Sequence, residues 1–179
     1  MSKFTELCKG YEDFRNEFGK VRVDMYGFSS KLVGHYLNYL GISFESNAEY
    51  RLIPLEGVVK EDTNYAPAGA THLGDDGYWH LGFLLTIYIS KNTYPQQKIK
   101  IHFKFLKDYE GKYILLVDEL NCKAVINNVD DLNEFIPVFD GVQDGILRFN
   151  LSGIDFLYGK NVKMSSIGFI QDGFFSENE

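Results

Sequence analysis

The sequence predicts an α+β domain in which helices pack on one face of a mostly antiparallel sheet. Three observations support this class. Several segments alternate apolar and polar residues over the length of a strand, short turn-forming stretches join these segments, and apolar residues recur at helical spacing before and after them. Consecutive strands joined by tight turns pair antiparallel, and the apolar face of such a sheet needs helices to cover it.

Length and composition fit one folded unit over residues 1–179. A chain of 179 residues buries roughly 70% of its unfolded surface, so it can form a core without disulfide or metal staples. Aromatic residues make up 16% of the chain, whereas disordered chains are poor in them. The two cysteines, Cys8 and Cys122, are too sparse for a disulfide framework. We interpret Cys8, on the same helical face as Leu7, as a reduced thiol in the core.

Apolar residues at helical spacing predict three helical regions. Residues 3–18 carry an apolar stripe that is expected to face the core, and Gly19 is the expected C-cap. Residues 29–41 predict a second helix that begins at serines and ends at glycine. Residues 127–149 predict a third region, which Pro137 would break or kink.

Alternating residues predict the strands. The clearest unit is a hairpin of residues 81–89 and 98–105: odd-numbered apolar residues share one face of both strands, and in 98–105 the even-numbered residues on the other face are polar. Pairing Ile89 with Ile99 keeps odd residues opposite odd residues, and in this register Leu85 pairs with Phe103. The other expected strands are residues 20–28, 50–59, 112–117, 151–157 and 162–170.

The remaining segments predict a long loop, a tail and a cytoplasmic protein. Residues 60–78 are rich in Asp, Asn, Gly and Pro and are the expected loop, while residues 171–179 are expected to fray. The N-terminus has charges throughout and does not resemble a signal peptide, and no stretch approaches the ~20 apolar residues that span a bilayer. A net charge of −7 argues against nucleic acid as a partner.

A candidate metal or catalytic site lies where the loop meets the hairpin. Imidazole and carboxylate groups suit zinc or manganese, and the stretch THLGDDGYWH holds four such residues: His72, Asp75, Asp76 and His80. They would support the alternative function, a metal-assisted hydrolase or a small-ligand-binding protein. The spacing fits no metal motif with a known mechanism.

A turn is the simpler interpretation of that stretch. Asp-Asp-Gly is turn chemistry, in which Gly77 is free to adopt a positive φ, and the residues from Trp79 onward would form a strand. In the expected register His102 lies opposite Thr86, roughly 20 Å from His80, so these two histidines could not share an ion. We therefore predict no cofactor.

Charge is unevenly distributed along the chain and suggests two surfaces. Acidic residues between positions 118 and 144 could form a ridge that binds a basic protein, as toxin-neutralising proteins and nucleic-acid mimics do. The residues concerned are Asp130, Asp131, Glu134, Asp140 and Asp144. The alternative is a solvated helix face with Asp130 or Asp131 as its cap. Lysines on the hairpin could bind an anionic partner, or could simply protect the sheet from aggregation.

Signatures of common enzymes are missing from the sequence. It contains no phosphate loop, no dinucleotide-binding glycine motif, no nucleophile elbow and no Cys-x-x-Cys pair. We therefore predict a non-enzymatic, acidic protein-binding or inhibitory domain. The identity of its partner and its oligomeric state stay open.

Overall fold

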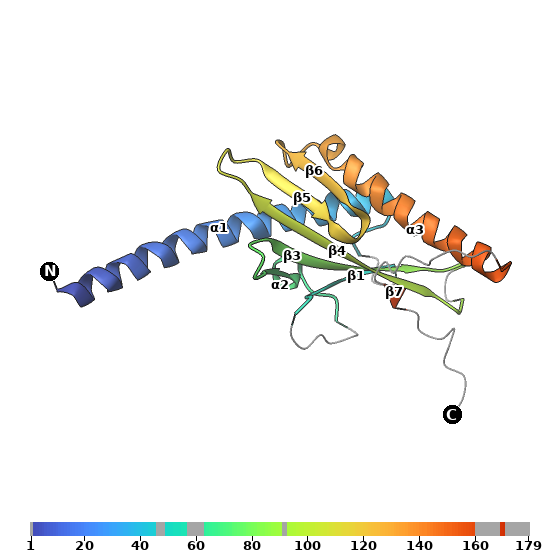
Figure 1. Ribbon diagram of the computed structural model, residues 1–179, viewed down its shortest axis with the longest axis horizontal. Coiled ribbons are helices and arrows are strands. Elements are labelled where there is room, and N and C mark those ends of the chain that lie inside the picture. The colour runs from blue at the N-terminus through green and yellow to red at the C-terminus, as the bar shows by residue number, and fades with distance from the viewer. Residues whose placement is uncertain (1, 46–48, 57–62, 91–92, 160–168, 171–179) are drawn as a thin grey trace, which may run out of the picture.

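The computed structural model describes residues 2–45, 49–56, 63–90, 93–159 and 169–170 (Figure 1). Its centre is one antiparallel sheet with the strand order β1-β3-β4-β5-β6, to which β2 adds beside β3 and β7 beside β4. The long helices α1 and α3 pack against the sheet and share one apolar core with it. The predicted α+β class is therefore confirmed.

The elements have the following bounds. The helices are α1 (Lys3–Leu40), α2 (Pro67–Ala70) and α3 (Ile136–Leu157), with the short 3-10 helices η1 (Asp118–Leu120) and η2 (Leu132–Glu134). The strands are β1 (Tyr50–Ile53), β2 (Thr71–Leu73), β3 (Trp79–Ile87), β4 (Gln97–Lys107), β5 (Tyr113–Val117), β6 (Cys122–Ile126) and β7 (Phe169–Ile170). Within the described part of the chain, no helix has the length and apolar character needed to cross a membrane.

Helix α1 is one continuous helix where the sequence predicted a helix, a strand and a second helix. It begins at the capping side chain of Ser2 and ends at Gly41, whose φ of 69° is left-handed. The predicted strand at 20–28 is wrong, and Gly19 is not a C-cap. Met25 and Phe28 are three residues apart and both buried, which is the spacing of a helix face and not of a strand.

The core forms between the C-terminal half of α1, the odd-numbered face of the sheet and α3. Tyr36 is fully buried and shows how these layers meet: its ring lies 5.0 Å from Phe83 on β3, 5.4 Å from Phe103 on β4 and 4.8 Å from Phe139 on α3. The predicted burial of the odd-numbered hairpin residues is correct for Leu81, Phe83, Leu85, Ile99, Ile101, Phe103 and Phe105, whereas Ile87 is half-buried and Ile89 is exposed.

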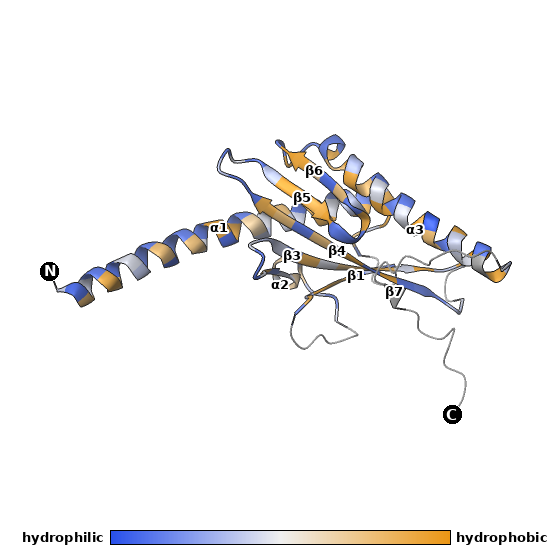
Figure 2. Ribbon diagram, in the orientation of Figure 1, coloured by the Kyte–Doolittle hydropathy of each residue, from blue (hydrophilic) through white to orange (hydrophobic). Residues whose placement is uncertain are grey.

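The N-terminal half of α1 extends away from the sheet into solvent (Figure 1). Its apolar residues continue the stripe that enters the core (Figure 2), but they are exposed: Phe4 by 73%, Leu7 by 72% and Phe14 by 62%. The prediction that this stripe faces the core is therefore wrong. Cys8 is exposed as well, so it is not the buried thiol that the sequence suggested.

The hairpin of β3 and β4 has a different register from the predicted one. Leu85 pairs with Ile99, and each further pair follows from this. Strand β3 ends at Ile87 and Ile89 is 93% exposed, so the connection between the strands is longer than the predicted turn. The odd-with-odd pairing is correct, but the shift places His102 opposite Gly82 and no longer opposite Thr86.

The chain after β5 also differs from the prediction. Strand β6 was not predicted, and α3 begins at Ile136 instead of residue 127. Pro137 lies in the first turn of α3, where a missing N–H costs no hydrogen bond, so it starts the helix and does not kink it. Helix α3 continues to Leu157, so the predicted strand at 151–157 is wrong.

The predicted long loop contains regular structure, since α2 and β2 lie within residues 60–78. The tail at 171–179 lies outside the described residues, as do 57–59 of the predicted strand at 50–59. Of the strand predicted at 162–170, the structure describes only β7.

Candidate functional site

Three of the four histidines gather on the face of the sheet opposite the apolar core. His72 on β2 pairs directly with His80 on β3. His102 on β4 pairs with Gly82, two residues along from His80 on the same face. The rings of His72 and His80 are 5.3 Å apart between centroids, and those of His80 and His102 are 4.8 Å apart. Three neighbouring strands thus form a row of imidazoles.

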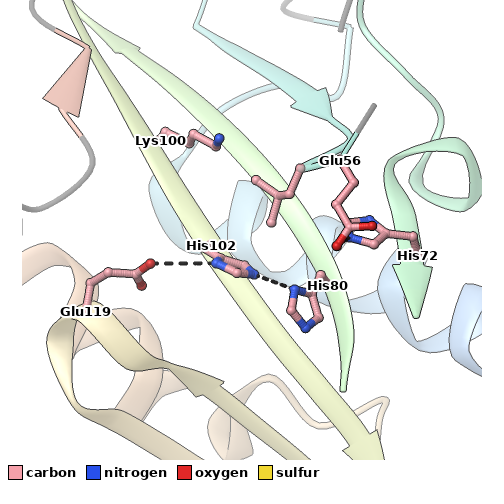
Figure 3. Close-up of a pocket in the computed structure, with 7 residues that line it drawn as sticks. Glu56, His72, His80, Lys100, His102 and Glu119 are labelled. Atoms are coloured by element: carbon pink, nitrogen blue, oxygen red, sulfur yellow. Dashed lines mark hydrogen bonds and ion pairs between the residues drawn. The ribbon is translucent and has the colours of Figure 1, made fainter. Parts of the chain in front are cut away.

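This row borders a pocket of about 440 Å³ (Figure 3). Its lining residues come from β2, β3, β4, the segment after β1 and η1, and all but one are polar or charged. They are Leu55, Glu56, His72, His80, Lys100, His102 and Glu119.

Gly82 allows the wall of the pocket to form. A Cβ atom at this position would lie 2.5 Å from the carbonyl oxygen of Ile53 and 2.8 Å from the side chain of Leu55. Only a glycine lets the chain after β1 cross this closely over β3. That crossing brings Glu56 to the pocket.

Gly82→Ala is expected to destabilise the protein by about 1–3 kcal/mol, because backbone atoms must shift to accept the methyl group. Gly27→Ala is the matched control: Gly27 is exposed in α1 with no atom within 4 Å of an added Cβ, so this change should stabilise the helix by up to about 1 kcal/mol. Urea unfolding of both variants tests the prediction. Equal effects of the two changes would contradict the close crossing.

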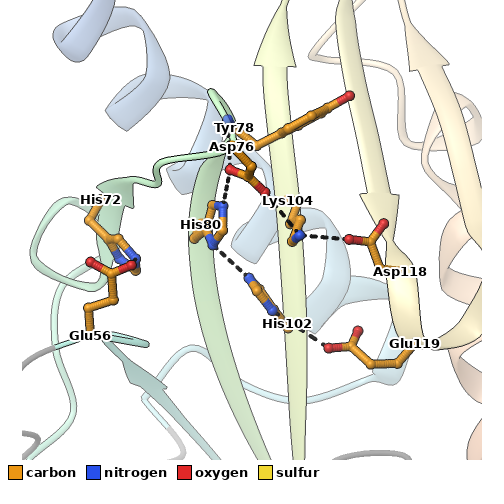
Figure 4. Close-up of polar contacts among 9 residues, drawn as sticks. All are labelled: Glu56, His72, Asp76, Tyr78, His80, His102, Lys104, Asp118 and Glu119. Carbon is orange, nitrogen blue, oxygen red and sulfur yellow. Dashed lines mark hydrogen bonds and ion pairs between the residues drawn. The ribbon is translucent and has the colours of Figure 1, made fainter.

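Asp76 anchors His80 (Figure 4). Its Oδ1 lies 2.8 Å from His80 Nε2, and its Oδ2 accepts a hydrogen bond of 3.0 Å from Lys104 Nζ. These two hydrogen bonds hold the pKa of Asp76 well below its ordinary value. A carboxylate that stays ionised fixes a proton on His80 Nε2, so His80 Nδ1 is the acceptor nitrogen of the neutral ring.

His102 is held in one tautomer by this chain of hydrogen bonds. Its Nε2 lies 3.0 Å from His80 Nδ1, and because that nitrogen of His80 is an acceptor, His102 Nε2 carries the proton. The Nδ1 of His102 is then unprotonated in the neutral ring, 3.6 Å from Glu119 Oε1. Burial lowers the pKa of His102, and this outweighs the opposite effect of Glu119. His102 therefore presents a free basic nitrogen beside a carboxylate.

His72 forms a second histidine–carboxylate pair on the other side of His80 (Figure 4). Its Nε2 lies 3.5 Å from Glu56 Oε1. Both ring nitrogens are inaccessible to solvent and lack a hydrogen-bond partner among the described residues. Catalytic hydrogen bonds are often long in a free protein and tighten when a ligand binds.

The structure brings together most of the predicted 72–80 site. His80 lies beside both His72 and Asp76, while Asp75 does not bond to any of these three residues. Gly77 has the predicted positive φ of 79°. In the described ranges of the chain, no group of three or more His, Cys, Asp or Glu residues is arranged to hold a metal ion.

Five pocket residues were missed by sequence reasoning: Leu55, Glu56, Lys100, His102 and Glu119. The exclusion of His102 was wrong because it depended on the incorrect hairpin register. The sequence did contain one indication of this pocket, because the two-residue period of the hairpin strands places His80, Lys100 and His102 on the same polar face of the sheet. Nothing in the sequence indicates that Glu56 and Glu119 reach that face.

Four of the five carboxylates of the predicted acidic ridge have partners within the chain. Asp130 forms an ion pair of 2.6 Å with Lys31, Asp131 caps η2, and Glu134 accepts hydrogen bonds from two backbone N–H groups. Asp140 accepts a 2.7 Å hydrogen bond from the hydroxyl of Tyr39. Asp144 is exposed. Three of these residues, Asp130, Asp131 and Glu134, precede α3 and do not form a helical ridge. Binding of a basic protein at this acidic surface stays a prediction.

The fold and the site define an α+β protein with a pocket of histidines and carboxylates on one face of an antiparallel sheet. Comparison with protein-family models, with characterised proteins and with solved structures finds no match. Function is therefore inferred from the chemistry of the pocket.

Proposed function

We propose that this pocket is the active site of an enzyme that uses acid–base catalysis on a small substrate carrying an anionic group. The observation that carries the proposal is the hydrogen-bonded chain from Asp76 through His80 to His102, which leaves His102 Nδ1 free beside Glu119. A neutral imidazole held in one tautomer by a carboxylate is the arrangement that general bases require.

His102 is assigned the role of the base. Burial favours its neutral form, which is the form that accepts a proton. The accepted proton would lie on Nδ1 and face Glu119 Oε1, now 3.6 Å away. The carboxylate would then stabilise the imidazolium through a charge-assisted hydrogen bond. Asp76 and His80 act as positioning residues, because their hydrogen bonds hold the ring of His102 in place.

His72 is assigned the role of the second proton-transfer group. It is separated from His102 by His80 along the row, so the two could serve different atoms of one substrate. Glu56 lies within ion-pair distance of its ring. Lys100, also at the pocket, supplies a positive charge for a carboxylate or phosphate group.

An NMR titration with inorganic phosphate tests the site. The ring signals of His72, His80 and His102 are expected to shift with one common dissociation constant. The signal of His35 should stay unchanged, because this ring bonds to the backbone oxygen of Val129 and packs on Phe135, outside the pocket. The fourth histidine is thus an internal control, and single His→Gln variants assign the signals.

Lys100→Met is expected to weaken phosphate binding by about tenfold, which corresponds to the loss of one charge-assisted hydrogen bond. Lys123→Met on β6 is the matched control, since Lys123 is exposed and does not line the pocket. Absence of any shift, or equal shifts of all four histidines, would overturn the proposal. Stoichiometric zinc or manganese retained after purification, and lost in His80→Ala, would favour a metal-assisted site instead.

A further inference from the structure

We propose that the exposed apolar stripe of α1 binds the same stripe of a second copy of this chain, in antiparallel orientation. The stripe consists of Phe4, Leu7, Tyr11, Phe14, Phe18 and Val21. This inference is independent of the pocket, which lies on other elements.

The spacing of the stripe is that of a two-stranded coiled coil. Its members are separated alternately by three and four residues, and the same spacing continues through Met25 and Phe28 into the core. One continuous seam is therefore covered by the protein's own sheet at its C-terminal end and exposed at its N-terminal end. The rings of Phe14, Phe18 and Trp79 stack in succession across this boundary, with centroids 6.0 and 6.2 Å apart.

The exposed half of α1 also needs a partner to be a stable helix. It contains Gly10 and Gly19, neither of which contacts any neighbour that would explain a glycine there, and glycine lowers helix propensity. Most helical stability in proteins comes from packing of the apolar face. A second helix would supply that packing for the residues that now face solvent.

The area available is sufficient for a dimer. Five stripe residues, all except Phe18, are 40–73% exposed. If each buries on the order of 100 Å², two copies bury roughly 1,000 Å², near the lower end of specific interfaces.

Charge supports a second copy as the occupant. Residues 3–24 contain five basic and five acidic residues, although the whole chain has a net charge of −7. Two copies of this segment can approach without net repulsion, whereas other parts of the chain would repel each other.

The position of the sheet favours the antiparallel orientation. Beyond Val21 the seam is occupied by the chain's own core (Figure 1), so a parallel helix would run into the sheet. In the antiparallel orientation the second helix has its N-terminus at this boundary. The sheet of the second copy then lies beyond the N-terminus of the first helix.

The charged residues that flank the seam select one antiparallel register. Opposing Phe4 with Val21 and Tyr11 with Phe14 of the second copy places no like charges side by side. If the two helices overlapped by one heptad more, the Arg15 side chains of the two copies would lie side by side, which is unfavourable.

Light scattering after size exclusion measures the association. The wild type is expected at twice the chain mass of 20.6 kDa, and Phe14→Glu at the monomer mass. Val23→Glu is the matched control, because Val23 is 68% exposed on the opposite side of the helix, and it should stay dimeric. Far-UV circular dichroism checks that the sheet domain stays folded, which the 62% exposure of Phe14 favours.

Cysteine pairs test the orientation in a variant without Cys8 and Cys122. Phe4→Cys combined with Val21→Cys should give a disulfide-linked dimer, whereas Phe4→Cys alone should not. Rapid cross-linking of Phe4→Cys alone would show a parallel pair and overturn the proposed orientation.

Three outcomes would overturn self-association through this stripe. One is a wild type that stays monomeric. If that monomer binds vesicles containing phosphatidylglycerol, the stripe would be assigned to a lipid surface. Another is a dimer that Phe14→Glu leaves intact. The third is a dimer lost in Leu151→Glu but kept in Phe14→Glu, which would assign association to the exposed apolar residues of α3.

Discussion

Phe28→Ala is expected to lower the free energy of unfolding by about 3–5 kcal/mol, the range for removing a buried aromatic ring from a packed core. Phe28 is 2% exposed. Its ring centroid lies 5.0 Å from that of Phe105, 4.3 Å from Tyr113 and 5.9 Å from Phe135. One side chain of α1 thus contacts two strands and the segment that leads into α3, and its loss leaves a cavity that none of them can fill alone.

Phe4→Ala is the matched control for this experiment. Phe4 is 73% exposed on the same helix, so its removal should change stability by less than about 0.5 kcal/mol. Both variants are measured by urea unfolding in the Phe14→Glu background, which removes any contribution from association. If Phe28→Ala cost no more than Phe4→Ala, the C-terminal half of α1 would not pack as the structure describes.

The contrast between Phe4 and Phe28 also shows why the sequence predicted α1 only in part. The spacing of apolar residues identifies a helix face, and this part of the prediction is correct for residues 3–18 and 29–40. It does not state whether that face meets the core, because an exposed seam and a buried seam have the same spacing. The segment between them alternates valines over a few residues, and tertiary packing overrides that local preference for a strand.

The hairpin shows a second limit of sequence reasoning. Alternation assigns each residue to a face, and the odd-numbered residues of both strands, except those at the end near Ile89, were correctly placed in the core. Register depends on where the connection between the strands begins, and sliding the strands by an even number of residues, here four, keeps every side chain on its face. That freedom separates His80 from His102 in one register and joins them by a 3.0 Å hydrogen bond in the other. Glu56 and Glu119 also line this pocket, but they come from the segment after β1 and from η1, and no local sequence pattern places those segments beside the histidines.

The stability of the protein is expected to fall over two pH ranges as the pH is lowered, and one residue of the hydrogen-bonded chain from Asp76 to His102 contributes in each range. Burial depresses the pKa of His102 in the folded protein below its ordinary 6.5. The unfolded chain then binds this proton more readily than the folded chain does. Stability is full above the unfolded pKa of about 6.5 and declines as the pH falls from there towards the folded pKa.

Asp76 contributes to the second step at lower pH, together with Asp24 and Asp130, whose pKa values are also lowered in the folded protein. Hydrogen bonds from His80 and Lys104 depress its folded pKa well below the ordinary 3.8. Its contribution is present above the unfolded pKa and is lost as the pH falls from about 4 towards and through the folded value. The two steps are therefore separated along the pH axis.

Substitutions assign the steps. His102→Gln should remove the decline that begins near pH 6.5 and leave the decline below about pH 4, because glutamine does not titrate. Asp76→Asn should reduce the lower step and lower stability at neutral pH, since His80 and Lys104 lose this ionised acceptor. Asp75→Asn controls for the removal of a carboxylate, because Asp75 lies in the same turn but is not the residue that bonds to His80 and Lys104. Urea unfolding across this pH range measures each profile. An upper step that survives His102→Gln would contradict the buried, neutral His102 on which the acid–base proposal depends.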